Sequence, residues 1–296
     1  MKQQHASTRW IDYSGQAWYT EHGHTVNQRR LTRADLDTLK RLAGTNEVIS
    51  AWDIRHIYYP LAQLILKVFH HKQMQNPTQD LFVLGISGSV AVGKSTGARV
   101  LTELLRHIAP PIALVTTDNF LKPNDQLEKE GLLQRKGFPE SYDEAVITRF
   151  IEDLAEKKPI LTIPTYDHIA YTILPNRLQE IARPNIVVLE GVNVLHHPAF
   201  TLDFSLFFDA KIDDIANWYV QRFVTFQKKA FSQPGAYFQR YAKLKVTEAE
   251  QVAKHLWQTI NLVNFDEHIL PSSKNADCII LKHQNHRIQS IRVRTT

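Results

Sequence analysis

A glycine-rich motif between an apolar and an amphipathic segment constrains the fold of this chain more than any other feature. Residues 88–95 have the sequence Gly-Ser-Val-Ala-Val-Gly-Lys-Ser, which matches the pattern G-x-x-x-x-G-K-[ST]. The apolar segment Leu81–Ile86 precedes the motif. The residues that follow it place one apolar face on a predicted helix: Val100, Leu101, Leu104, Leu105 and Ile108. This order predicts a buried strand, a phosphate-binding loop and a helix, and it disfavours a chance glycine-rich turn.

The spacing within this motif suits a nucleotide polyphosphate bound with Mg²⁺. Gly88 and Gly93 allow backbone angles and a close approach that a side chain would block, so that successive N–H groups can surround an anion. Lys94 is expected to reach the β- and γ-phosphates of ATP, and the Ser95 hydroxyl is expected to ligate Mg²⁺. The residues predicted to bind ATP here are Gly88, Ser89, Val90, Ala91, Val92, Gly93, Lys94, Ser95 and Thr96.

Further along the chain, short apolar segments are mostly separated by helical patterns, as expected of an α/β fold. None of these segments shows the in–out alternation of a half-exposed strand, so we predict a mostly parallel central sheet flanked by helices on both faces. Ligands bind at the carboxyl ends of the strands in such sheets. The predicted strands are Leu81–Ile86, Ile112–Val115, Ile186–Leu189, Phe204–Phe208 and Cys278–Leu281.

The first part of the chain has a helical rather than a strand pattern. We predict that residues 1–80 form an N-terminal helical segment packed on a kinase-like core of residues 81–296, so that the chain makes one compact domain overall. Thr32 opens a capping-box pattern at the start of one helix. A second helix is expected to start near Ser50 and to be broken or restarted at Pro60.

The composition argues against several classes of function. Lys and Arg total 35 against 30 Asp and Glu, a net charge of +5, and they form no dense basic block, so we expect no nucleic-acid partner. No uncharged apolar run approaches the roughly 18–20 residues that a membrane helix needs. Met1–Trp10 lacks the apolar core of a signal peptide. We therefore expect a cytoplasmic protein without a membrane partner.

The cysteine and histidine residues give no sign of a metal centre. Cys278 is the single cysteine, so it can form neither an internal disulfide nor a cysteine-based zinc site, and its apolar surroundings predict a core position. The pairs His70-His71 and His196-His197 have no partners at metal-ligand spacing, and we predict that they lie at the surface.

Two carboxylates at strand ends favour a kinase among the nucleotide-binding classes. Asp118 lies just past Ile112–Val115, where it could act as the base beside the γ-phosphate in transfer to an alcohol, or serve as a cap or turn residue. Glu190 ends the segment Ile186–Leu189, where it could hold Mg²⁺ through water or form a simple turn. The N-K-x-D signature of GTPases is absent, which argues against that class.

An arginine within an aromatic helical stripe indicates the acceptor side. In the helix predicted over Ile212–Ala230, Tyr219, Arg222 and Phe226 share one face. Such a stripe is usually core, but a guanidinium within it needs an anionic partner, either a protein carboxylate or an acidic substrate. The loop Pro164–Tyr171 adds two phenols and an imidazole, which either line a polar pocket or cap the sheet.

These features together make the chain similar to the bacterial type I pantothenate kinase family, from about Leu36 to the C-terminus. A generic P-loop kinase would share the glycine-rich motif but not the other matching segments. The segments that carry the resemblance are Gly88–Thr96, Lys136-Gly-Phe-Pro-Glu-Ser-Tyr-Asp143, Leu189-Glu-Gly-Val-Asn-Val-Leu195, Tyr237-Phe238, Tyr241-Ala-Lys-Leu244 and Asn264–Pro271.

The resemblance implies a P-loop kinase fold and ATP-dependent phosphorylation of pantothenate to 4'-phosphopantothenate, the first step of coenzyme A biosynthesis. It implies that Asp118 is the catalytic base and that Lys94 and Ser95 bind phosphate and Mg²⁺. The family forms homodimers, commonly through the helix that follows the phosphate-binding loop, and coenzyme A inhibits it by competing with ATP. The positions that match the pantothenate pocket are Tyr166, His168, Tyr171, Tyr219, Arg222 and Asn261.

The same resemblance assigns two further sets of residues. Asn46 and His286 match positions beside the adenine of ATP, while Arg99, His168 and Phe226 match the coenzyme A inhibitory site. From the residues alone, Asn261 is either a pocket residue or an ordinary surface amide.

The chain departs from the family pattern at a few positions, and other functions stay open. Asn119 stands where glycine is more frequent, Asp167 stands where serine is usual, and the stretch His196–Asp203 is short. These departures leave open the strength of coenzyme A feedback and the shape of the acceptor pocket. The nearest alternative is another P-loop kinase that acts on uridine or a ribulose phosphate. An alternative from a different class is a nucleotide-binding regulator without phosphotransfer.

Overall fold

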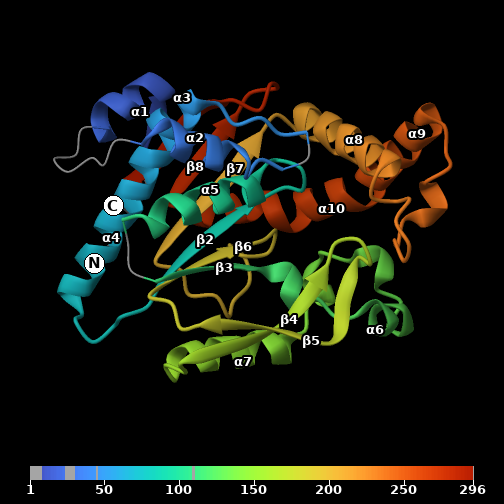
Figure 1. Ribbon diagram of the computed structural model, residues 1–296, viewed down its shortest axis with the longest axis horizontal. Helices are drawn as coiled ribbons and strands as arrows, with labels where there is room; N and C mark the ends of the chain where they lie inside the picture. Colours follow the sequence, from blue (N-terminus) through green and yellow to red (C-terminus); the bar gives the residue numbers. More distant parts are fainter. Residues whose placement is uncertain (1–8, 24–30, 45, 109–110, 296) are drawn as a thin grey trace, which may run out of the picture.

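The computed structural model describes residues 9–23, 31–44, 46–108 and 111–295. A seven-stranded sheet with the order β1-β9-β8-β7-β2-β6-β3 forms the centre, and β4 and β5 form a separate two-stranded sheet (Figure 1). The strands are β1 (Arg9–Ser14), β2 (Phe82–Gly88), β3 (Ile112–Thr116), β4 (Ile160–Asp167), β5 (Thr172–Ala182), β6 (Ile186–Glu190), β7 (Phe204–Ala210), β8 (Cys278–Lys282) and β9 (Ile288–Thr295).

Five parallel strands, β8-β7-β2-β6-β3, make up most of this sheet and confirm the predicted α/β fold. Nearly every residue of β7, β2 and β6 is buried, so these strands lack in–out alternation, whereas buried and partly buried residues alternate along β3 and β8. On β7, for example, the adjacent residues Phe207 and Phe208 are 0% and 1% exposed and belong to apolar cores on opposite sides of the sheet. Because both faces are covered, every position of such a strand favours an apolar side chain.

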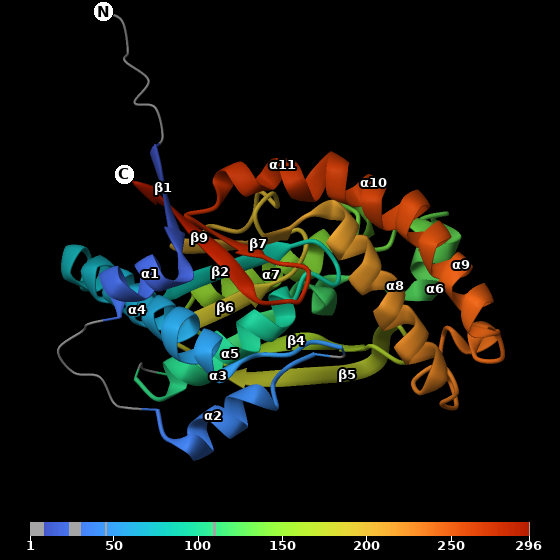
Figure 2. The same ribbon diagram turned by 90° about the horizontal axis from the view of Figure 1, so that it is seen from above.

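Helices cover both faces of the sheet (Figure 2). One core contains residues of α1, α4, α5 and α8, and the other contains residues of α7 and of the helical region around α10. The helices are α1 (Gly15–His22), α2 (Arg33–Lys40), α3 (Ala51–Asp53), α4 (Tyr59–Gln75), α5 (Lys94–Arg106), α6 (Asn124–Lys129), α7 (Glu144–Ala155), α8 (Ile212–Lys228), α9 (Val246–Leu256), α10 (Leu262–Asn264) and α11 (Leu270–Ser272).

The N-terminal segment is not helical throughout, so that part of the prediction is wrong. β1 pairs antiparallel with β9, with Trp10 opposite Arg294, and these two strands extend one edge of the sheet. Residues 1–8 and 24–30 of the predicted helical segment lie outside the described residues. The helices of this segment do pack on the core, because Trp18 and Leu39 belong to the same apolar cluster as Phe208.

Local helix signals were predicted correctly where side chains cap the backbone. Thr32 caps α2 in a capping box, and the Ser50 side chain caps α3. Pro60 does not break the chain's helical course, because a π-helical turn, Ile54–Tyr58, joins α3 to α4 and Pro60 lies in the first turn of α4. The missing N–H of proline costs little in a first turn.

Two predictions about Cys and His positions have different outcomes. Cys278 is buried in β8, as predicted for a core residue. His70 and His71 are exposed as predicted, but the surface prediction is wrong for His197, which is 6% exposed with its Nε2 3.1 Å from Glu144 Oε1. Glu144 belongs to α7, which is distant in the sequence, so the spacing of the two histidines could not indicate this partner.

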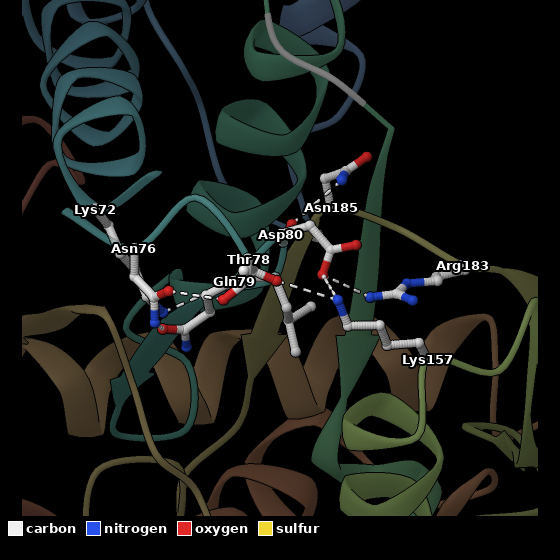
Figure 3. Close-up of polar contacts among 9 residues, drawn as sticks. Lys72, Asn76, Thr78, Gln79, Asp80, Lys157, Arg183 and Asn185 are labelled. Atoms are coloured by element: carbon white, nitrogen blue, oxygen red, sulfur yellow. Dashed lines mark hydrogen bonds and ion pairs between the residues drawn. The ribbon is translucent and has the colours of Figure 1, made fainter. Parts of the chain in front are cut away.

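A polar network ties together the segments that lead into the sheet at the amino ends of β2 and β6 (Figure 3). Asp80 Oδ1 lies 2.9 Å from Arg183 Nη2 and 3.3 Å from Lys157 Nζ. The Asp80 carbonyl oxygen accepts a hydrogen bond from Asn185 at 3.2 Å. Burial alone would raise the pKa of Asp80. The contacts with Lys157 and Arg183 outweigh this effect and lower the pKa below its usual range.

The Asp80 side chain is 40% exposed, so its ion pairs are expected to contribute little. Asp80→Asn should destabilise the protein by only about 0.5–1 kcal/mol near neutral pH. Because the folded-state pKa is lowered, this contribution is present above the unfolded pKa of about 3.9 and is lost as the pH falls through the folded value. Thermal unfolding of both proteins from neutral to acidic pH checks this, and a difference that persists in acid would contradict it.

Candidate active site

A cavity of about 790 Å³ is lined by residues at the carboxyl ends of β3 and β6, by the phosphate-binding segment after β2, and by residues of the β4–β5 hairpin and α8. The carboxyl ends of the strands are the edge at which ligands were predicted to bind. The cavity gathers residues from segments far apart in the chain. The sequence-predicted residues that line it are Val90, Ala91, Gly93, Lys94, Ser95, Thr96, Arg99, Asp118, Tyr166, His168, Tyr171, Glu190, Tyr219, Arg222, Phe226 and Asn261.

The phosphate-binding loop connects β2 to α5, as predicted. Gly88 and Gly93 both have positive φ, 146° and 95°, and Ala91 also lies in the left-handed region. A Cβ atom on Gly88 would lie 2.5 Å from the backbone oxygen of Phe208, so both the angle and the space require glycine. The loop ends at the N-terminus of α5, where free N–H groups favour an anion.

Lys94, Ser95 and Glu190 form a compact polar group beside this loop. Glu190 ends β6 and is 6% exposed. Its Oε1 accepts a hydrogen bond from Ser95 Oγ at 3.0 Å and lies 3.5 Å from Lys94 Nζ. A lysine held by a carboxylate at the N-terminus of a helix is placed to exchange that carboxylate for a phosphate oxygen.

Asp118 lies in the 3₁₀ turn Thr117–Phe120 that directly follows β3. Its backbone N–H donates to Thr116 Oγ1 at 3.4 Å, and within the part of the chain that the structure describes its carboxylate has no hydrogen-bond or ion-pair partner. A half-buried carboxylate without a protein donor is available to accept a proton from a bound ligand.

Lys136 is a cavity residue that the sequence analysis missed. Its Nζ donates to Asn124 Oδ1 at 2.7 Å and to the Tyr171 carbonyl oxygen, and lies 4.3 Å from the centre of the Tyr171 ring. Burial lowers the pKa of Lys136 to about 8, while the charge of Asp118 opposes this shift. The residue opens the segment Lys136–Asp143, and its position there was the only available signal.

Arg222 lies on α8 between Tyr219 and Phe226, all facing the cavity as predicted. Burial lowers the pKa of its guanidinium, and Tyr219 and Glu47 oppose this effect. Among the described residues, Arg222 forms no hydrogen bond or ion pair. A guanidinium in this position is suited to an anionic ligand.

The segment Pro164–Tyr171 is not a loop throughout, because Tyr166 and Asp167 belong to β4 of a hairpin. Asp167 Oδ1 accepts hydrogen bonds from the backbone N–H groups of Ile169 and Ala170 at 2.7 and 2.8 Å, so this departure from the family pattern shapes the turn. These backbone hydrogen bonds lower the pKa of Asp167. The other departure, Asn119, donates to the Pro164 carbonyl oxygen at 2.5 Å and attaches the hairpin to the end of β3.

Asn261 reaches the cavity through an irregular helix. The helical run from α9 to α11 contains two π-helical turns, Trp257–Asn261 and Phe265–Ile269. A π turn shifts the phase of the side chains that follow it. Leu256 and Ile260 line the cavity beside Asn261.

The two residues matched to adenine lie outside the large cavity. The exposed Asn46 side chain donates to Thr225 Oγ1 on α8 at 2.7 Å. His286 stacks on Trp218, with ring centres 4.1 Å apart and planes at 24°, and burial lowers its pKa to about 4. Arg99, by contrast, lines the cavity while its guanidinium donates to the Leu42 carbonyl oxygen at 3.0 Å.

No helix among the described residues is long and apolar enough to cross a bilayer. The same part of the chain contains no group of three or more His, Cys, Asp or Glu side chains that could hold a metal ion.

Comparison with known proteins gives similarities over most of the chain. A family model described as the phosphoribulokinase / uridine kinase family matches residues 83–226. Pantothenate kinase from Corynebacterium aurimucosum is 40% identical over 273 residues, which cover 86% of this chain and 89% of the relative. Pantothenate kinase from Psychromonas ingrahamii is 38% identical over 282 residues, which cover 87% of this chain and 88% of the relative.

Among solved structures, D-glycerate 3-kinase from Cryptococcus neoformans var. grubii matches with a TM-score of 0.53 and 12% identity. The match covers 78% of this chain and 97% of that chain. At this level of identity the similarity concerns the fold alone.

Proposed function

The chain belongs to the pantothenate kinase family, and on this basis we propose that it transfers the γ-phosphoryl group of ATP to the primary hydroxyl of pantothenate. The product would be 4'-phosphopantothenate, in the first step of coenzyme A biosynthesis. One arrangement carries the proposal: Lys94, Asp118 and Arg222 line the same cavity, and the Asp118 carboxylate and the Arg222 guanidinium have no hydrogen-bond or ion-pair partner among the described residues. This arrangement supports a phosphoryl donor bound at Lys94 and an acidic alcohol bound at Asp118 and Arg222.

On the donor side, the N–H groups of the loop surround the α- and β-phosphates of ATP in this proposal, and the Lys94 ammonium reaches the β- and γ-phosphates. Ser95 and Glu190 fit a Mg²⁺ site, because their oxygens lie 3.0 Å apart and hard oxygen ligands suit this ion, with ATP and water completing its shell. When bound, Mg²⁺ neutralises charge on the phosphates. Lys94 adds a fixed positive charge where negative charge develops during transfer.

On the acceptor side, Asp118 accepts the proton of the pantothenate hydroxyl as its oxygen attacks the γ-phosphorus. Arg222 binds the pantothenate carboxylate in a charge-assisted contact. The remaining residues proposed to enclose pantothenate are Tyr166, His168, Tyr171, Tyr219 and Asn261.

We further propose that coenzyme A inhibits this enzyme in competition with ATP. Arg99, His168 and Phe226 line the same cavity as Lys94, so a ligand bound to them would meet the nucleotide phosphates. The adenine of ATP is proposed to lie beside Asn46 and His286, which are not among the residues that line this cavity.

The assembly and location of the protein are also proposals. We propose a cytoplasmic homodimer in which residues 1–80 and 81–296 act as one unit. α5 is largely buried within its own chain and exposes only Arg106 and the following His107 among the described residues of its last turn. A second copy that contacts α5 would therefore meet mainly the end of this helix.

A coupled ADP-release assay tests the proposed activity directly. With Mg-ATP and the full-length chain, pantothenate is expected to elicit turnover, and coenzyme A is expected to suppress it. Turnover with uridine or ribulose 5-phosphate, but not with pantothenate, would favour the other P-loop kinases. ATP binding without turnover for any acceptor would favour a nucleotide-binding regulator.

Arg222→Ala is expected to raise the KM for pantothenate by about 10–100-fold, as loss of a charged hydrogen bond does. The KM for ATP should change little, because the phosphate-binding loop is untouched. Arg177→Ala, which removes an exposed arginine on β5, is the matched control. Steady-state kinetics with each substrate varied check this, and an unchanged KM for pantothenate would return Arg222 to a structural role.

A further inference from the structure

Lys282 is a buried lysine that the mechanism above does not use. It is the last residue of β8 and is 5% exposed. Its ammonium group donates a hydrogen bond to the Val92 carbonyl oxygen in the phosphate-binding loop at 3.0 Å. Burying a charged ammonium group costs free energy. A lysine that is buried against the phosphate-binding loop is therefore a candidate for a role in that loop.

The hydrogen bond from Lys282 fixes the orientation of one peptide group. In a trans peptide the carbonyl oxygen and the amide hydrogen point in opposite directions. With the Val92 oxygen held toward Lys282, the N–H of Gly93 points away from β8. Gly93 lines the large cavity, so this N–H is directed to the side where phosphate would bind.

The space around Gly93 shows how closely Lys282 fits. A Cβ atom added to Gly93 would lie only 2.4 Å from Lys282 Nζ and 3.2 Å from Glu47 Oε2. The Lys282 ammonium also lies 5.6 Å from the centre of the Trp218 ring. Lys282 therefore lies directly against the Val92–Gly93 peptide group.

Two carboxylates of the N-terminal segment lie near Lys282, although neither forms an ion pair with it among the described residues. Burial lowers the pKa of Lys282, while Glu47 and Asp53 oppose this effect. Glu47 Oε2 is buried and has no hydrogen-bond partner among the described residues. Lys282, Glu47 and Asp53 all line one small cavity behind the loop.

We propose that Lys282 is a positioning residue that holds the Val92–Gly93 peptide so that the Gly93 N–H faces the nucleotide polyphosphate. This proposal rests on the proposed ATP site but not on the identity of the acceptor. Gly93 directly precedes Lys94, the residue that reaches the β-phosphate. Loss of Lys282 should therefore weaken the binding of nucleotides that carry a β-phosphate and change the binding of AMP little.

Isothermal titration of the full-length chain with Mg-ADP and with AMP tests this inference. Lys282→Met removes the donor while keeping a similar side-chain length. It is expected to weaken ADP binding at least about ten-fold, as loss of a charged hydrogen bond does. AMP binding is expected to change less than about two-fold, since AMP lacks the β-phosphate.

Lys211→Met, which removes an exposed lysine near the carboxyl end of β7, is the control for net charge. It should leave binding of both nucleotides unchanged. Should Lys282→Met fail to fold, Lys282→Gln takes its place, because the shorter side chain does not reach Val92 but retains a polar end. Equal losses for ADP and AMP, unchanged ADP binding, or failure of both variants to fold would each overturn the proposal.

These outcomes are separable from the fate of the proposed activity. If wild-type protein shows no turnover with pantothenate but binds ADP, the acceptor assignment fails while the role of Lys282 can still be measured. If turnover is normal and Lys282→Met binds ADP as the wild type does, the role of Lys282 fails alone.

Discussion

Lys94→Ala is expected to lower kcat by at least about 10³-fold, the scale seen when a cation that stabilises phosphoryl transfer is removed. The Lys94 ammonium lies 3.5 Å from Glu190 Oε1. Its loss would remove the fixed positive charge proposed to contact the β- and γ-phosphates. Arg99 cannot take its place, since its guanidinium donates to Leu42 and Thr96. Single-turnover and steady-state rates with Mg-ATP and pantothenate give the measurement.

The control for Lys94→Ala is Lys129→Ala, which removes an exposed lysine at the end of α6. Circular dichroism and thermal unfolding should show both variants folded, because Lys94 is partly exposed at the first residue of α5 and packs in no apolar core. A near-normal rate in folded Lys94→Ala would remove the phosphate-binding loop from the proposed mechanism.

Asp118→Asn is expected to lower kcat by about 10²–10⁴-fold, the usual contribution of a general base. The amide keeps the size of the carboxylate but cannot accept the hydroxyl proton. The KM for ATP should stay within about three-fold, because Asp118 follows β3 and not the phosphate-binding loop. The kinetic signature is a loss in kcat with both substrates still bound.

Asp125→Asn, an exposed residue on the neighbouring α6, provides the matched control for Asp118→Asn. ADP titration of both variants separates binding from catalysis. A wild-type kcat in Asp118→Asn would show that another group activates the hydroxyl.

The elements predicted from sequence are those whose residues are dictated by their immediate neighbours or by burial on both faces. The parallel strands β7, β2 and β6 are such a case, because burial on both sides favours apolar side chains along the whole segment. The capping of α2 by Thr32 depends on residues three positions apart. The phosphate-binding loop is equally local, since Gly88 to Ser95 are consecutive.

The missed features depend on contacts between distant segments. β1 is a strand only because β9, nearly 280 residues away, pairs with it. The π turns that bring Asn261 to the cavity alter the helical period, which the apolar pattern of a regular helix cannot show. Lys136 and Lys282 acquire their surroundings from tertiary packing. Lys136 had no signal beyond its place at the start of the segment Lys136–Asp143, and Lys282 had none.

The order of the strands has a consequence for how mutations should divide between stability and catalysis. β2, β6 and β3 are hydrogen-bonded neighbours, and they lead respectively to the phosphate-binding loop, Glu190 and Asp118. Neighbouring strands are about 4.8 Å apart. The main-chain hydrogen bonds between these strands therefore fix the spacing of the phosphate-binding loop, Glu190 and Asp118. Substitutions of apolar residues in the two cores that cover the sheet should therefore lower the free energy of unfolding. They should change the alignment of the reacting groups much less.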